Sequence, residues 1–157
     1  MTILRLFTDG SVNPKSKVGY GAYLAVPLEV PYSESFKTAV KVKKFEQTSS
    51  TKLEIQTLIW ALTSIQKPAG RIIVYTDSQN IISLQARRRR LEKNDYLSKK
   101  NKPIKNRVLY QEFFNLSDQL DCEFEKVKGH KPSRLKDESD RFFTWVDKAS
   151  RKALRNH

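Results

Sequence analysis

Three acidic residues stand where carboxylates could act together on a substrate. Asp9 directly follows the apolar residues 3–8, Asp77 directly follows residues 72–76, and Glu54 lies between them in the sequence. If the two segments form neighbouring strands, the two Asp side chains lie side by side, and Glu54 can reach them from the first turn of a helix. Clustered carboxylates repel one another and need cations, and hard oxygen ligands with few His or Cys favour Mg²⁺ or Mn²⁺. Two such ions could activate a water and stabilise the leaving oxygen of a phosphodiester.

Each acid also has a structural interpretation, which the sequence leaves open. Asp9-Gly10 is a strong turn signal, and Asp77 could cap the helix that follows it. Glu54 shares one face of its predicted helix with four apolar residues, Leu58, Ala61, Leu62 and Ile65. That face must point at the sheet, and an unpaired buried carboxylate is costly, so Glu54 needs a partner. A salt bridge to Lys52 is the alternative to a metal.

Hydrophobic periodicity and turn signals divide the chain into nine elements in the order βββαβααβα. The predicted strands cover residues 3–8, 18–26, 36–47, 72–75 and 122–127, and the predicted helices cover residues 52–66, 80–90, 106–120 and 142–155. The first three strands have short connections, which are typical of an antiparallel meander. The order therefore predicts an α/β fold with a mixed five-stranded sheet and helices packed on it, in a single domain over residues 1–157.

The composition favours a polyanionic partner. The net charge is +13, from 30 Lys and Arg against 17 Asp and Glu, and such an excess attracts nucleic acid because each neutralised phosphate releases a counterion. No apolar run is long enough to span a membrane, and residues 1–5 lack the apolar segment of a secretory signal. The single Cys122 cannot form an internal disulfide. We therefore expect a cytoplasmic protein with no membrane partner.

Five short motifs, in order and over nearly the full chain, resemble those of ribonuclease HI, the type 1 ribonuclease H family. Any one of them is weak evidence, but five in the same order are strong. The motifs are Asp9-Gly10-Ser11 with residues 19–22, Leu53-Glu54, Thr76-Asp77-Ser78-Gln79, Lys128-Gly129-His130, and residues 147–153, which begin at Asp147.

The resemblance implies the ribonuclease H-like fold and hydrolysis of the RNA strand of an RNA–DNA hybrid, leaving 5′-phosphate and 3′-hydroxyl ends. It implies two Mg²⁺ per site, for which Mn²⁺ could substitute, held by Asp9, Glu54, Asp77 and Asp147. His130 would assist proton transfer or product departure, since an imidazole titrates near neutral pH. The alternative for His130 is a loop histidine with no role. We also expect a monomer without an attached reverse transcriptase or second hybrid-binding domain.

Contacts to the substrate are less certain from the family pattern. Relatives often carry two Asn just before the helix Glu, and this chain departs from that pattern with Ser50 and Thr51, which become the candidates for minor-groove contacts. Asn13 and Gln79 remain candidates for contacts to sugars or bases. Gly10 and Ser11 of the first motif complete this predicted set.

Residues 85–107 carry ten Lys or Arg against two acids, a net charge of +8. A charge run is usually a solvated surface loop, but some type 1 relatives carry a basic protrusion at this place, which grips the hybrid. Such contacts would give affinity more than sequence choice, because phosphates carry no base information. The predicted substrate-binding residues here are Arg87, Arg88, Arg89, Arg90, Lys99, Lys100, Lys102 and Lys105.

The fourth acid has two candidates. Asp140 lies ten residues after His130, a spacing found in well-known relatives, whereas Asp147 makes the intervening stretch longer. The small residues that follow Asp147 suit a helix packed closely on a sheet, and bulky aromatic residues follow Asp140. On one helix the two would stand roughly 10 Å apart along the axis, so both could not bind the same metal. We therefore assign the metal site to Asp147 and a surface or capping role to Asp140.

Three other functions compete with this interpretation. A DNA nuclease of the same fold, such as a junction resolvase, shares clustered acids, but the Lys-Gly-His loop and the basic segment favour a ribonuclease H. An inactive hybrid-binding module would not need all four acids. A basic structural protein bound to RNA would need no Glu on an apolar helix face.

Overall fold

The computed structural model describes residues 2–65, 70–128 and 131–157. Its strands are β1 (Ile3–Asn13), β2 (Val18–Pro27), β3 (Lys41–Phe45), β4 (Arg71–Thr76) and β5 (Cys122–Lys126). Its helices are α1 (Ser50–Ser64), α2 (Gln79–Lys93), α3 (Arg107–Gln119) and α4 (Glu138–Arg155), with two 3₁₀ helices, η1 (Glu34–Ala39) and η2 (Ser133–Leu135). The order of strands and α-helices confirms the predicted βββαβααβα arrangement.

The five strands form one mixed sheet in the order β3-β2-β1-β4-β5. Strands β1, β2 and β3 form the predicted antiparallel meander, and β4 and β5 run parallel to β1. The ladder between β1 and β4 ends with the pair Phe7 and Tyr75. Asp9 and Asp77 each follow that pair by two residues, so the register aligns them at the same edge of the sheet, as the sequence predicts.

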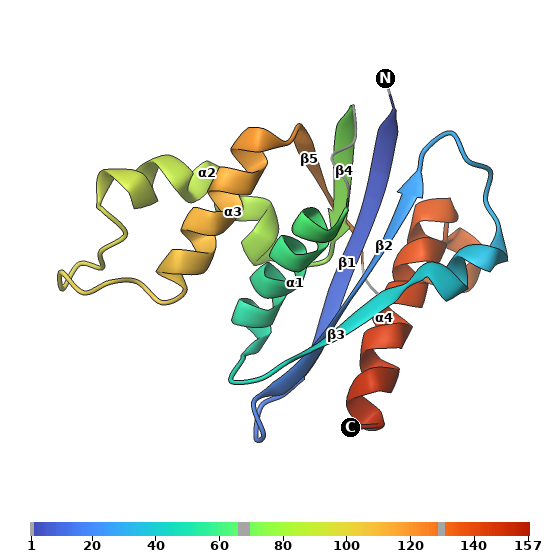
Figure 1. The fold of residues 1–157 in the computed structure, drawn as a ribbon, viewed down its shortest axis with the longest axis horizontal. Helices are drawn as coiled ribbons and strands as arrows, with labels where there is room; N and C mark the ends of the chain where they lie inside the picture. Colours follow the sequence, from blue (N-terminus) through green and yellow to red (C-terminus); the bar gives the residue numbers. More distant parts are fainter. Residues whose placement is uncertain (1, 66–69, 129–130) are drawn as a thin grey trace.

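Both faces of the sheet are covered, and the alternation along β1 shows why. Leu6 and Phe7 are both fully buried, but Leu6 belongs to the core beneath α1 and α3, whereas Phe7 belongs to the core beneath α4. Figure 1 shows α1 and α4 on opposite sides of β1, with α2 and α3 extending beyond the β5 edge. In the described part of the chain, no helix is long and apolar enough to cross a membrane.

The predicted third strand, residues 36–47, is wrong in its first half. Residues before β3 form the 3₁₀ helix η1, because the Ser33 side chain accepts a hydrogen bond from the Ser35 backbone and caps it. Phe36 then packs edge-on against Phe142 of α4, with ring centroids 5.8 Å apart. Because Phe36 packs against α4, this segment does not place its side chains alternately on the two faces of the sheet, as a continuous strand would.

The last helix begins four residues before the predicted start. Asp137 caps α4, and a reciprocal hydrogen bond from the Asp137 backbone to the Asp140 side chain completes a capping box. The other predicted helices begin and end within a few residues of those observed, as is usual for helix boundaries. Residue 66, where the first predicted helix ends, lies outside the described residues.

Close packing of α1 on β2 fixes where Glu54 stands. Gly21 of β2 lies against Thr57 of α1, and a Cβ on Gly21 would overlap the Thr57 hydroxyl. The helix can therefore approach the sheet only because residue 21 has no side chain. Glu54 lies three residues before Thr57 on the same helix, and its side chain is hydrogen-bonded to Ser78, next to Asp77.

Gly21→Ala is expected to destabilise the fold by roughly 1–3 kcal/mol, the usual cost of overpacking a close interface. Urea unfolding monitored by circular dichroism measures this change. The matched control is the double variant Gly21→Ala with Thr57→Ala, which removes the overlapping atoms and is expected to recover most of the lost stability. Equal losses in the single and double variants would contradict the packing argument.

Candidate active site

Four acidic residues from four different elements stand at the same edge of the sheet. Asp9 lies within β1, Glu54 is the fifth residue of α1, Asp77 follows β4 directly, and Asp147 lies on α4. Asp9 is the most perturbed of them. Burial, the charge of Asp77 and a hydrogen bond with Asp147 together raise the pKa of Asp9 to about 8. Asp9, Asp77 and Asp147 are therefore close enough to repel one another strongly.

Glu54 has a neutral partner in the structure. The Ser78 hydroxyl donates a 2.7 Å hydrogen bond to Glu54 Oε2, and Ser78 Oγ also accepts from the backbone of Ile81, which caps α2. Burial and the charge of Asp77 raise the pKa of Glu54, while the Ser78 hydroxyl acts in the opposite direction. The alternative of a salt bridge to Lys52 is wrong, since Lys52 Nζ donates to the Gln47 carbonyl oxygen.

The structural alternatives for the two Asp are also wrong. Asp9 makes no turn, because β1 continues past it to Asn13 with Asp9 paired to Ala22. Asp77 does not cap α2, because Ser78 does. Burial and the charge of Asp147 raise the pKa of Asp77. Carboxyl groups held in this way at a strand edge, without a capping or turn function, are typical of functional sites.

The two candidates for the fourth acid have different surroundings. Asp147 faces Asp9 and Asp77 and forms a 3.0 Å ion pair with Arg151, one helical turn further on. Asp140 belongs to the capping box of α4 and accepts from Lys131 Nζ at 2.9 Å. The geometry therefore places Asp147 with the other acids and gives Asp140 the capping role that the sequence predicts.

The donor set fits a hard divalent cation. All four side chains offer carboxylate oxygens, and a bound cation would relieve the mutual repulsion that raises the pKa values of Asp9 and Asp77. Within residues 2–65, 70–128 and 131–157, no group of three or more His, Cys, Asp or Glu side chains converges on a position that could hold an ion. The observation that favours a cation here is the mutual repulsion among Asp9, Asp77 and Asp147, which together with burial raises the pKa values of Asp9 and Asp77.

The predicted substrate-contacting residues divide into two groups. Ser11 and Gln79 lie beside the acids: Ser11 Oγ is 3.0 Å from Ser150 Oγ of α4, and Gln79 accepts from Lys126 Nζ, whose charge reaches Asp77. Asn13 instead caps the β1–β2 turn by accepting from the backbone of Lys15.

Three further predicted residues are placed by α1. Ser50 and Thr51 form its exposed first turn, and Gly10 lies against Leu53. The helix thus brings these positions to the rim of the acidic site, with Ser49 rather than Ser50 or Thr51 as its cap. His130 and its neighbour Gly129 lie outside the described residues.

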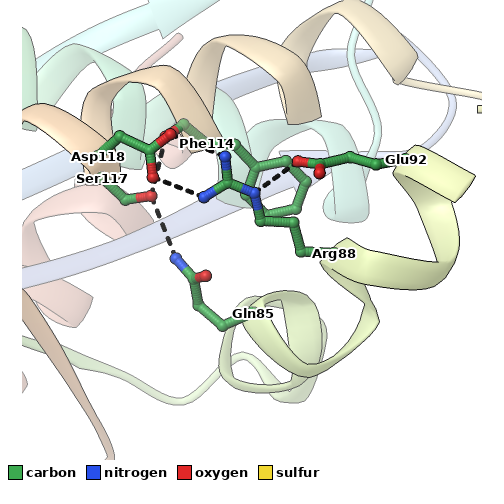
Figure 2. Close-up of polar contacts among 6 residues, drawn as sticks. All are labelled: Gln85, Arg88, Glu92, Phe114, Ser117 and Asp118. Atoms are coloured by element: carbon green, nitrogen blue, oxygen red, sulfur yellow. Dashed lines mark hydrogen bonds and ion pairs between the residues drawn. The ribbon is translucent and has the colours of Figure 1, made fainter.

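The basic segment is built from the end of α2, a loop and the start of α3. Arg88 is taken up within it: its guanidinium donates to both oxygens of Asp118 at 2.6 and 2.7 Å and to Glu92 at 2.6 Å, and it stacks on Phe114 (Figure 2). Gln85 reinforces this junction through Ser117, as Figure 2 also shows.

The other predicted basic residues differ in whether their side chains are hydrogen-bonded within the protein. Arg87 donates to the Asn80 side chain at 2.6 Å. The remaining residues are exposed and form no ion pair within the described part of the chain. They are Arg89, Arg90, Lys99, Lys100, Lys102 and Lys105. Arg88 therefore ties α2 to α3, and the exposed residues form the cationic surface.

Sequence reasoning missed two residues that surround the acids. Ser78 orients Glu54, and Arg151 pairs with Asp147 and lowers the pKa of Asp77. The signals were present, because Ser78 follows a strand-end Asp at a helix start and Arg151 stands four residues after Asp147. Their targets, however, are set by the packing of α1 and α4 on the sheet.

A mixed sheet of this topology, with acids gathered from β1, α1, β4 and α4, defines a hydrolase of the ribonuclease H-like fold. Comparison with known proteins agrees. The RNase H family model matches residues 1–146. The chain belongs to the RNase H family, whose members hydrolyse the RNA strand of RNA–DNA hybrids. The match ends one residue before Asp147, so the assignment of that acid depends on the geometry.

Relatives and solved structures support the same conclusion. A ribonuclease H of Caldicellulosiruptor saccharolyticus is 30% identical over 141 residues, covering 86% of this chain and 89% of that protein. One of Treponema pallidum is 28% identical over 149 residues, covering 90% and 88%. The PFV RNase H domain superposes with a TM-score of 0.73 at 17% identity, covering 96% of this chain and 92% of that one. A type 1 RNase H with the type 2 active-site motif superposes with a TM-score of 0.72 at 16% identity, covering 97% of this chain and 72% of that one.

Proposed function

We propose that Asp9, Glu54, Asp77 and Asp147 together hold two Mg²⁺, or Mn²⁺ in their place, and carry out hybrid hydrolysis that leaves 5′-phosphate and 3′-hydroxyl ends. The observation that carries the proposal is that β1, β4 and α4 bring Asp9, Asp77 and Asp147 together, and burial with their mutual repulsion raises the pKa of Asp9 to about 8. When bound, two such cations activate a water and stabilise the leaving oxygen of a phosphodiester.

The chain's own residues orient these ligands. Ser78 holds Glu54 by a hydrogen bond to Oε2, which leaves Glu54 Oε1 for a cation. Arg151 holds Asp147 through Oδ1 at 3.0 Å, which leaves the second carboxylate oxygen of Asp147 for a cation. Outer hydrogen bonds of this kind fix the direction of metal-ligating carboxylates. His130 is proposed to assist proton transfer or product departure.

Recognition of RNA is proposed to come from 2′-hydroxyl contacts along the rim of the site. The polar groups available there are the side chains of Ser11 and Gln79 and the exposed first turn of α1, with Ser50 and Thr51. Gly10 lets Leu53 approach β1 closely, and Asn13 supports the adjacent turn. The protein is proposed to act as a cytoplasmic monomer.

The exposed cations of residues 85–107 are proposed to bind phosphates of the hybrid. The double variant Arg89→Ala with Arg90→Ala is expected to reduce the slope of log Kd against log salt concentration by about 2, because two fewer counterions are released. KM is expected to rise while kcat changes little, because these residues do not touch the reacting phosphate. Fluorescence anisotropy with a labelled hybrid at several salt concentrations measures the slope.

The control for this experiment is Arg71→Ala, which removes a positive charge at the opposite end of β4 from Asp77. It is expected to leave the salt slope unchanged. An unchanged slope in the double variant would remove the basic segment from the binding surface.

One assay separates the proposed activity from a nuclease for DNA and from an inactive binding module. The protein is incubated with Mg²⁺ and a matched set of hybrid, duplex DNA and duplex RNA of the same sequence. Cleavage confined to the RNA strand of the hybrid is the expected result. Cleavage of duplex DNA, or binding of the hybrid without cleavage, would replace the proposal with one of those alternatives.

A further inference from the structure

A basic pocket adjoins the acidic site and is not used by the proposed chemistry. Its floor is one face of α4, and its wall consists of Val127, Lys128, Lys131 and Lys136, which lie between β5 and α4. It shares Asp77 and Asp147 with the acidic site, and its cationic lining consists of Lys128, Lys131, Lys136, Lys148 and Arg151.

Lys136 is held in this pocket by a neutral hydrogen-bond partner. Lys136 Nζ donates to Thr144 Oγ1 at 2.9 Å, and the Thr144 hydroxyl donates its only hydrogen to the Asp140 carbonyl oxygen at 2.9 Å. The hydroxyl can therefore only accept from Lys136, and two of the three N–H donors of the ammonium group stay available. A half-buried lysine oriented by a neutral partner is suited to binding an anion.

The other cations of the pocket differ in how far they are neutralised. Lys131 pairs with Asp140 at 2.9 Å and Arg151 pairs with Asp147 at 3.0 Å. Among the described residues, neither Lys136 nor Lys148 forms an ion pair. Lys148 follows Thr144 by one helical turn, which places it on the same face of α4. Lys128 of the lining forms no ion pair among the described residues either, so the pocket presents three positive charges without acidic partners next to the catalytic acids. Of these three, Lys148 lies on α4 and Lys136 is hydrogen-bonded to it through Thr144.

We propose that Lys136 and Lys148 form a subsite for one backbone phosphate of the cleaved strand, next to the scissile phosphate. This inference rests on the proposed function, since the acids fix where the scissile phosphate must lie. A strand that passes Asp77 and Asp147 brings its neighbouring phosphates to the pocket that these two residues help to line. The subsite would bind the strand through charge-assisted hydrogen bonds and hold the scissile phosphate in register with the acids.

The test neutralises the phosphate and the lysine separately. A set of hybrids carries one uncharged methylphosphonate linkage in the RNA strand, moved one position at a time within two nucleotides of a single cleavage site. Each has a 2′-deoxy sugar on the 5′ side of the linkage for chemical stability, and its reference hybrid has the same sugar with an ordinary phosphate. For the wild-type protein, one position other than the scissile linkage is expected to raise KM about tenfold, the usual worth of a hydrogen bond between charged groups.

Lys136→Met is expected to raise KM about tenfold on the reference hybrid and to respond no further to the methylphosphonate at that position. Lys136→Arg retains the charge and is expected to behave as the wild type. Lys152→Met removes a charge from α4 outside the pocket lining and is expected to keep the full response to the methylphosphonate. Circular dichroism melts of all three variants establish that they fold.

The two contradicting outcomes distinguish failure of the subsite from failure of the proposed function. If the wild type cleaves the hybrid but Lys136→Met responds to every methylphosphonate as the wild type does, the subsite is wrong and the proposed function stands. If the wild type cleaves no hybrid, the proposed function fails and the subsite with it.

Discussion

Asp9→Asn is expected to reduce kcat for hybrid cleavage by more than about a hundredfold, since loss of even an outer partner at a metal site costs up to that much. The substitution keeps the shape of the side chain and removes the charge that a cation would bind. Hydrolysis of a labelled hybrid in saturating Mg²⁺ gives kcat. The matched control is Asp121→Asn, which changes an exposed acid at the opposite end of the sheet and is expected to leave kcat unchanged.

The same substitution is expected to stabilise the metal-free protein. The pKa of Asp9 rises from 3.8 to about 8 in the folded state. The unfolded chain therefore ionises first as the pH increases, so wild-type stability declines between about pH 4 and pH 8. Asp9→Asn removes this decline and should be more stable at pH 8 by on the order of 1 kcal/mol or more. Urea unfolding at pH 5 and pH 8 in excess EDTA measures the difference.

Two results would contradict this account of Asp9. Full wild-type activity in excess EDTA would remove the cation from the mechanism. A loss of stability in Asp9→Asn at pH 8 would mean that the Asp9 carboxylate is stabilised by its surroundings rather than repelled by Asp77 and Asp147. Loss of activity together with a gain in stability is the combination expected of a residue retained for function.

The sequence predicts the positions of Asp9 and Asp77 well because they follow from local patterns, although β1 continues past Asp9 to Asn13 where the predicted strand ends at residue 8. Asp9 and Asp77 each end an apolar run, and the parallel pairing of β1 with β4 aligns them without further information. Glu54 is predicted because a carboxylate on an apolar helix face has few structural explanations. Its actual partner, Ser78, could not be predicted, because the contact depends on how closely Gly21 lets α1 approach the sheet.

Side chains whose roles depend on tertiary contacts were the least predictable. Sequence composition does not distinguish the four consecutive Arg residues of α2. In the structure, however, Arg88 donates hydrogen bonds to Asp118, thirty residues away on α3. Phe36 is similar, since its packing against Phe142 of α4 replaces part of a predicted strand with a 3₁₀ helix. In both cases the deciding partner is distant in sequence, and hydrophobic periodicity carries no information about it.

The pair Asp147 and Asp140 tests the geometry of the fourth acid most directly, because the family match ends at residue 146 and includes only Asp140. The structure separates the two by their neighbours. Asp147 acts on Asp9 and raises its pKa, whereas Asp140 accepts from the Asp137 backbone and from Lys131. Seven residues on one helix also separate them by roughly 10 Å, so only one can join the other acids.

Asp147→Asn is expected to reduce kcat by more than about a hundredfold, as Asp9→Asn does, because it removes charge from the same group. Asp140→Asn is expected to leave kcat within about twofold of the wild type and to lower stability by roughly 0.5–2 kcal/mol, since it weakens the capping box of α4 and the ion pair with Lys131. Hybrid cleavage and urea unfolding of both variants give the two quantities. The reverse pattern, with activity lost in Asp140→Asn and retained in Asp147→Asn, would move the fourth ligand to Asp140. It would also require the N-terminal turn of α4 to lie against β1 in place of the turn that carries Asp147.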